Sequence, residues 1–138
     1  MDVLFLIGRI LFVLLFFGSA IGHLTQTEAM AGYAESRGVR PARPAVLATG
    51  VQIGIGALLV LLGIWMDVGF ILLAVFLIAT AILMHAFWKE SDQQARYMEQ
   101  IQFMKDLALA GASLMLLAAV WMLGEDLGLT ITDPLFSP

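Results

Sequence analysis

Four long apolar stretches constrain this chain more than any other feature of its sequence. They cover about residues 3–22, 45–66, 68–88 and 106–124, and none contains more than one Asp, Glu, Lys or Arg. A helix needs about 20 apolar residues to cross the hydrocarbon core of a bilayer, and lipid leaves no exposed backbone group satisfied, so each stretch should be a continuous helix. In a chain of 138 residues, four such helices leave room only for short loops. We therefore expect an all-α protein, a four-helix transmembrane bundle that forms one domain over residues 1–138.

The composition excludes several other classes of protein. Hydrophobic residues make up 61% of the chain and charged residues 13%, against about 45–50% and about 25% in soluble domains. Cysteine is absent, which removes disulfides and thiolate metal sites. The chain has 7 basic and 11 acidic residues, so it offers no basic surface for a nucleic acid. We expect its main surroundings to be the lipid bilayer.

The basic residues indicate how the spans are oriented. Arg37, Arg40 and Arg43 lie in the loop after the first stretch, whereas Lys89 and Arg96 lie in the loop after the third. Apart from Arg9, the other end of the bundle carries only acids. Because Lys and Arg accumulate in cytoplasmic loops, we expect both loops in the cytoplasm and both termini outside.

Both cytoplasmic loops show amphipathic patterns. Thr25 and Glu28 have the spacing of a helix capping box, and apolar residues then recur at helical spacing until Gly38. Residues 90–104 are polar with interspersed apolar side chains. We expect a short surface helix in each loop, the second leading into the fourth span.

Polar residues within the spans cluster at the cytoplasmic end. His23 ends the first span and His85 lies near the end of the third, which runs in the same direction. Lys105 and Asp106 open the fourth span, and Gln52 lies near the start of the second. Because ionisable groups are costly in a bilayer, these five residues form a candidate polar pocket.

The two histidines allow three interpretations. They are the minimal ligand pair for a haem, or a proton-handling pair beside a quinone headgroup, or interfacial side chains that bind only backbone groups. We expect no haem, because two histidines alone are a weak signal and interfacial histidines are ordinary, and no protein metal site, because such a site needs three or four ligands. We expect no tightly bound cofactor, with a quinone contact left open. No motif identifies a catalytic residue, and we expect no catalytic activity from the chain alone.

Two further features concern helix packing. Gly18 and Gly22 in the first span and Gly50 and Gly54 in the second form GxxxG motifs, which allow helices to approach closely. Arg9 lies in the outer half of the first span. It either reaches the outer headgroups or pairs with an acid such as Asp67 or Glu125.

The order of these motifs resembles the DoxX family of small bacterial membrane proteins. The features that carry the resemblance are Gly22-His23-Leu24, the loop from Tyr33 through Gly38 to Pro41, His85-Ala86-Phe87-Trp88, and the segment 102–109 that opens the fourth span. Two positions depart from the family pattern, which often has Glu where this chain has Gln52 and Lys-Asn where it has Lys105-Asp106.

The resemblance implies a multi-pass protein of the bacterial inner (cytoplasmic) membrane, linked to redox complexes. It implies an accessory subunit of a redox-linked, quinone-associated complex, whose chemistry lies largely in other membrane or peripheral redox proteins. The alternative function is a structural or assembly subunit with no ligand chemistry of its own.

Overall fold

The protein is all-helical, as predicted. The computed structural model describes residues 1–136, except for the side chain of Glu125, and contains no strand in that part of the chain. Four of its helices are long and apolar enough to cross a membrane. The α-helices are α1 (Asp2–Thr25), α2 (Thr27–Ser36), α3 (Ala42–Leu62), α4 (Met66–Leu83) and α5 (Gln93–Leu123), with short 3-10 turns η1 (Phe87–Lys89) and η2 (Gly124–Asp126).

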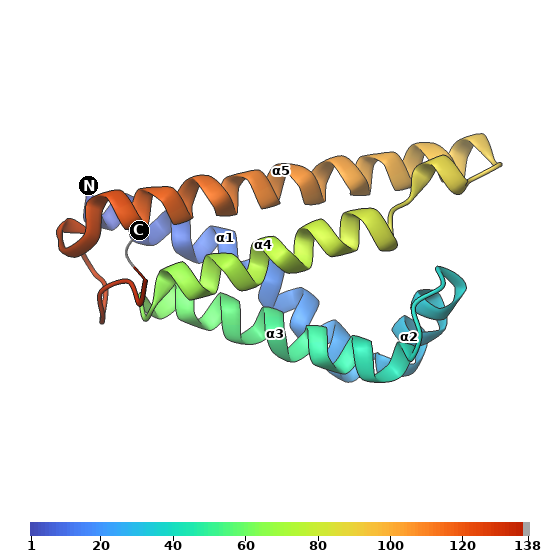
Figure 1. Ribbon diagram of the computed structural model, residues 1–138, viewed down its shortest axis with the longest axis horizontal. Helices are drawn as coiled ribbons and strands as arrows, with labels where there is room; N and C mark the ends of the chain where they lie inside the picture. The colour runs from blue at the N-terminus through green and yellow to red at the C-terminus, as the bar shows by residue number, and fades with distance from the viewer. Residues whose placement is uncertain (137–138) are drawn as a thin grey trace.

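The four long helices pack in the order α1, α3, α4, α5. Each neighbouring pair in this series is in contact, whereas no Cα atom of α1 lies within 8 Å of one of α5. The N-terminus and the last described residues before 137 lie at one end of the bundle, called here the terminal end (Figure 1). Helix α2 and η1 lie toward the opposite end, called the loop end. The bundle is therefore open along the side where α1 faces α5.

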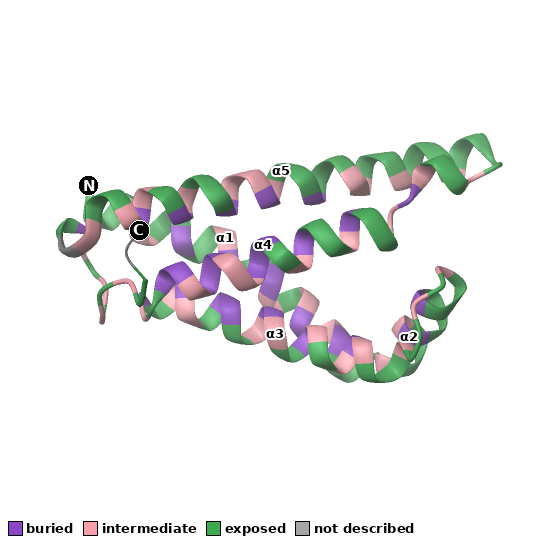
Figure 2. Ribbon diagram, in the orientation of Figure 1, coloured by how far each residue is buried: buried purple, intermediate pink, exposed green. Residues whose placement is uncertain are grey.

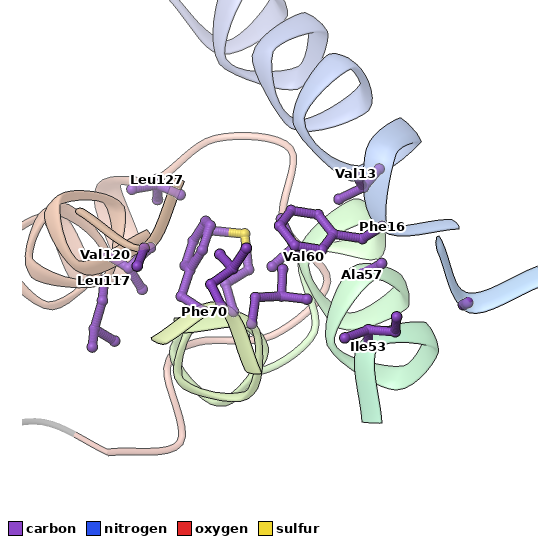
Figure 3. Close-up of a cluster of buried hydrophobic side chains, with 14 residues drawn as sticks. Val13, Phe16, Ile53, Ala57, Val60, Phe70, Leu117, Val120 and Leu127 are labelled. Atoms are coloured by element: carbon purple, nitrogen blue, oxygen red, sulfur yellow. The ribbon is translucent and has the colours of Figure 1, made fainter. Parts of the chain in front are cut away.

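The largest buried side chains lie in the middle and the terminal half of the bundle. Val13 and Phe16 of α1 meet Ile53, Ala57 and Val60 of α3, with Phe70 of α4 and Leu117 and Val120 of α5 completing the cluster (Figure 3). At the loop end the buried apolar residues are smaller, Ala31, Ala34 and Val46. Residues on the outer faces of the long helices are mostly exposed (Figure 2) and apolar, as lipid-facing residues should be.

The fourth span is part of a longer helix than we predicted. Helix α5 begins at Gln93, so residues 93–104 continue the span and do not form a separate surface helix. Asp92 caps the helix by accepting a hydrogen bond from the Ala95 amide at 2.8 Å, and no Gly or Pro follows before Gly111. With 31 residues, α5 is about 46 Å long and exceeds the about 30 Å hydrocarbon core.

The first surface helix is present, but its start differs from the predicted capping box. Helix α1 extends to Thr25 and α2 starts at Thr27, without a side-chain cap. The Thr25 hydroxyl donates to the Ile21 carbonyl at 2.7 Å, and that of Thr27 donates to the His23 carbonyl at 2.8 Å. Both hydroxyls therefore bond to backbone carbonyls of α1 and do not cap α2.

Helix α3 ends at a tight turn before α4. Gly63, with φ 68°, caps α3 in the left-handed conformation that glycine adopts without steric cost. Asp67, in the first turn of α4, is fully buried and accepts hydrogen bonds from the amides of Leu135 and Phe136 at 3.0 and 2.8 Å. This carboxylate fixes the C-terminal segment against the terminal end of the bundle.

Candidate functional site

A cavity of about 400 Å³ lies at the loop end. Helices α1, α3 and α4 form most of its wall, α2 covers it, and α5 contributes its edge. The wall is predominantly apolar, and its polar side chains include all five residues of the predicted pocket: His23, Gln52, His85, Lys105 and Asp106. The structure thus brings residues from four separate segments of the chain to one cavity.

The imidazole of His23 is held by its own helix. It is 8% exposed, and its Nδ1 lies 2.8 Å from the carbonyl oxygen of Ser19. Since a carbonyl only accepts, Nδ1 must carry the proton, which leaves Nε2 as an acceptor in the neutral ring. The ring also packs edge-on against Phe76, with centroids 5.8 Å apart. His23 therefore has a fixed orientation, and no hydrogen bond to Nε2 occurs within residues 1–136.

Gln52 presents a second acceptor. Its Nε2 donates to the carbonyl oxygen of Leu72 on α4 at 2.9 Å, which fixes the orientation of the amide. The Oε1 atom accepts no hydrogen bond from the part of the chain that the structure describes. A half-buried amide with one end bound and the other end free is suited to orienting a polar group in the cavity.

His85 connects the cavity to the aqueous side. Its Nδ1 donates to Glu99 Oε2 at 2.8 Å, and its Nε2 lies 3.7 Å from Asp106 Oδ2. The Asp106 carboxylate, 5% exposed, is in turn 3.6 Å from the ammonium of Lys105. The two carboxylates are seven residues apart, two turns along one face of α5. His85 thus lies between an acid in the cavity wall and an acid on the extension of α5.

A polar clamp of Tyr33, Arg37, Glu90 and Glu99 joins α2 to the opposite wall. Arg37 forms ion pairs with Glu90 and, at 2.7 Å, with Glu99, whose carboxylate also accepts from the Tyr33 hydroxyl at 2.9 Å. Burial raises the pKa of the Tyr33 hydroxyl, and the hydrogen bond to Glu90 is the main cause that raises the pKa of the Arg37 guanidinium. Both groups therefore remain donors at neutral pH, and the clamp holds α2 over the cavity.

The sequence predicts no contact among these clamp residues, although Arg37 is one of the loop arginines and Tyr33 belongs to a segment that carries the family resemblance. Charged residues in a loop are usually solvated. Because residues 90–104 were expected to form a surface helix apart from the fourth span, Glu99 was not expected to align with Asp106. The available signal was the seven-residue spacing of Glu99 and Asp106, which places both on one face only if the helix continues.

The four glycines of the GxxxG motifs differ in what they contact. A Cβ at Gly50 would lie 2.7 Å from the Cβ of His23, and one at Gly54 would lie 3.6 Å from that of Ala20. Gly22 faces only Met30, at 3.9 Å, and nothing lies within 4 Å of a Cβ at Gly18. Gly50 thus allows α3 to pack closely against α1, beside the cavity, whereas Gly18 makes no close contact.

Arg9 binds backbone carbonyls at the terminal end. It is 4% exposed, so it does not reach the headgroups, and it donates to the carbonyls of Val60 and Leu129 at 2.9 and 2.7 Å and to that of Leu61. The alternative of an ion pair with Asp67 is also wrong, because that carboxylate is bound to backbone amides. The Glu125 side chain lies outside the described part of the structure. Carbonyls at the end of a helix are free acceptors, which explains the preference of Arg9 for the end of α3.

These features define a multi-pass membrane protein with four spanning helices and a polar-edged cavity at one end. The family model named DoxX matches residues 4–86, more than half of the chain, so the protein belongs to the DoxX family. Comparison with curated proteins and with solved structures gives no match. The matched residues include α2, α3, α4 and all of α1 except its first two residues, and they extend to His85 and Ala86.

Proposed function

We propose that the protein is a quinone-binding accessory subunit of a redox-linked membrane complex. The observation that carries the proposal is the cavity at the loop end, where an apolar wall is combined with oriented acceptors on His23 and Gln52. A volume of about 400 Å³ lies within the range of small-molecule sites. A hydroquinone matches this lining, because its ring is apolar and its two opposed hydroxyls can donate to these two acceptors.

The residues around the cavity fit both redox forms of such a ligand. The Nε2 atom of His23 and the Oε1 atom of Gln52 can accept hydrogen bonds from the hydroxyls of a hydroquinone. The ammonium of Lys105 can donate to a ring carbonyl. His85 and Asp106 can hold or release a proton at the cavity edge, as an imidazole between two carboxylates is suited to do. When bound, the quinone supplies the redox chemistry, and the protein supplies binding and orientation.

The electrons would come from or go to a partner protein, since the chain has no cysteine for an iron–sulfur cluster. The extension of α5 offers a contact surface for such a partner, because Tyr97, Met98 and Ile101 are exposed there. The same surface favours the second candidate function, an assembly subunit without a ligand. The two functions differ in whether the cavity binds a quinone.

Quinone binding by the purified protein tests the proposal. We expect a short-tailed quinone to quench the intrinsic tryptophan fluorescence saturably in lipid nanodiscs. Gln52→Leu should weaken its affinity by about fivefold, since one hydrogen bond is worth about 1 kcal/mol. Gln94→Leu, which alters an exposed glutamine outside the cavity, is the matched control and should bind normally.

His85→Ala gives a second measurement. The variant should lose quinone affinity while keeping its helical content in detergent. Absence of saturable binding, or equal losses in Gln52→Leu and Gln94→Leu, would contradict the proposal. A defect in folding alone after His85→Ala would favour the assembly function.

We also propose that the protein lies in the bacterial inner membrane with its loop end in the cytoplasm. The support is the distribution of basic residues, with Arg37, Arg40 and Arg43 all near α2. Since the chain lacks cysteine, a single introduced thiol reports its own side of the membrane. In intact spheroplasts an impermeant maleimide should label Asp133→Cys, and it should label Ser36→Cys only after lysis. The reverse pattern would refute this orientation.

A further inference from the structure

A second cavity, of about 560 Å³, lies at the terminal end of the open side of the bundle. Its wall comes mainly from residues 1–12 on the α1 side and from Leu116, Leu123 and residues 126–128 on the α5 side. Most of its lining is apolar, and Phe70 of α4 and Val60 of α3 line it as well. Neither the polar pocket nor the clamp accounts for this cavity.

The two cavities follow one another along the same helices. On α1, Phe12 lines the second cavity, whereas Leu15, Phe16 and Ser19 line the first. On α5, Asp106 lines the first cavity and Leu116 the second. Because no Cα atom of α1 comes within 8 Å of α5, no helix backbone closes the side along which the two cavities lie. We call the two cavities, together with the face of α1 between them, the α1–α5 groove; the rings of Phe12 and Phe16, with centroids 5.1 Å apart, lie at the junction of the two cavities.

We propose that the α1–α5 groove holds the polyisoprene tail of the ligand whose headgroup occupies the first cavity. This inference rests on the proposed function and adds the ligand class, a long-tailed quinone in preference to a short one. The tail would leave the polar pocket at Ser19, pass the rings of Phe12 and Phe16, and enter the second cavity near Gly8. Ser19 and Gly8 are separated by 11 residues of one helix, or about 16 Å along its axis.

Two observations favour a tail over a phospholipid as the occupant of the second cavity. First, the outer opening of the cavity carries Asp2 and Asp126, which would repel the phosphate of an outer-leaflet lipid. Second, the buried Arg9 directs three of its donors to backbone carbonyls. A polyisoprene tail has no headgroup to place at this end, so neither feature opposes it.

Gly8 offers a way to close the groove without disturbing the bundle. It lines the second cavity, and a Cβ built on it meets nothing within 4 Å. Gly18 is the matched control, because it is on the same helix, is equally unobstructed, and lines neither cavity. Gly8→Phe should fill the groove, whereas Gly18→Phe should only add a lipid-facing ring.

The experiment compares two quinones with the same headgroup, one with a single isoprene unit and one with a full-length tail. Binding is measured in nanodiscs by tryptophan quenching and expressed per mole fraction of quinone in lipid, so that partition into the bilayer cancels. Lipid chains are as apolar as the groove, and the gain from the groove therefore comes from close packing. We expect the long-tailed quinone to bind about tenfold more tightly to the unaltered protein, from the sum of many small contacts.

The variants separate this inference from the proposed function. Gly8→Phe should abolish the advantage of the long tail and leave the affinity for the short quinone unchanged, whereas Gly18→Phe should retain both. Equal binding of the two quinones by the unaltered protein would overturn the tail site while leaving the headgroup site intact, and would assign the groove to ordinary lipid. Absence of binding by either quinone would overturn both.

Discussion

Replacing Arg9 by methionine should lower the free energy of unfolding by about 3 kcal/mol, because three carbonyl oxygens would each lose a hydrogen bond worth about 1 kcal/mol. The guanidinium binds the carbonyls of Val60 and Leu61, at the end of α3, and that of Leu129, in the C-terminal segment. Methionine has a similar length and fills the same space, so the loss should reflect the missing donors. Reversible unfolding by SDS in mixed micelles measures the change.

Two variants test whether the effect comes from these particular contacts. Arg9→Lys keeps the charge but cannot reach three carbonyls at once, so it should have an intermediate stability. Arg43→Met removes an exposed arginine that pairs with Glu28 at 2.6 Å, and it should change the stability by less than about 1 kcal/mol. An equal loss in Arg9→Met and Arg43→Met would show that the carbonyl contacts do not stabilise the bundle.

The four spans could be predicted from the sequence because burial in lipid imposes a simple rule on length and hydropathy. The convergence of His23 and His85 on one cavity follows from the same rule. Successive spans alternate in direction, so the C-terminal end of α1 and the loop after α4 lie at the same end of the bundle. Contacts of individual polar groups do not follow from it. Arg9, for example, had several partners within reach, and the choice depends on where α3 ends and leaves its carbonyls free.

The start of α5 shows a different reason for a wrong prediction. Hydropathy changes near residue 105, where the chain leaves the hydrocarbon, but helix formation depends on backbone hydrogen bonds and continues to the cap at Asp92. Because the helix runs on into water, Glu99 reaches both His85 and Arg37. The sequence therefore predicted five polar residues of the cavity wall, but not Tyr33, which lines the cavity and also belongs to the clamp.

Among the four glycines of the GxxxG motifs, Gly50 should be the one at which substitution by valine is most damaging to both the fold and the cavity. A Cβ at this position would lie 2.7 Å from the Cβ of His23 and 3.3 Å from the side chain of Leu24. The Leu24 methyl group can rotate away, but the Cβ of His23 cannot move without the backbone of α1, so the two helices must separate. Overpacking of this kind costs about 1–3 kcal/mol. The same change at Gly18 meets open space, and valine and glycine differ little in helix propensity, so Gly18→Val should alter the stability by less than about 1 kcal/mol.

The consequence for function follows from which side chain is displaced. His23 is fixed between Gly50 on one side and the ring of Phe76 on another, so a shift of α1 moves the Nε2 atom that faces the proposed ligand. Gly50→Val should therefore lose quinone affinity as well as stability, whereas Arg9→Met, which acts at the far end of the bundle, should lose stability with a smaller change in affinity for a short-tailed quinone. SDS unfolding and tryptophan quenching on the same samples separate the two effects. If Gly50→Val kept full stability and full affinity, that result would contradict the claim that the close packing of α1 on α3 positions His23.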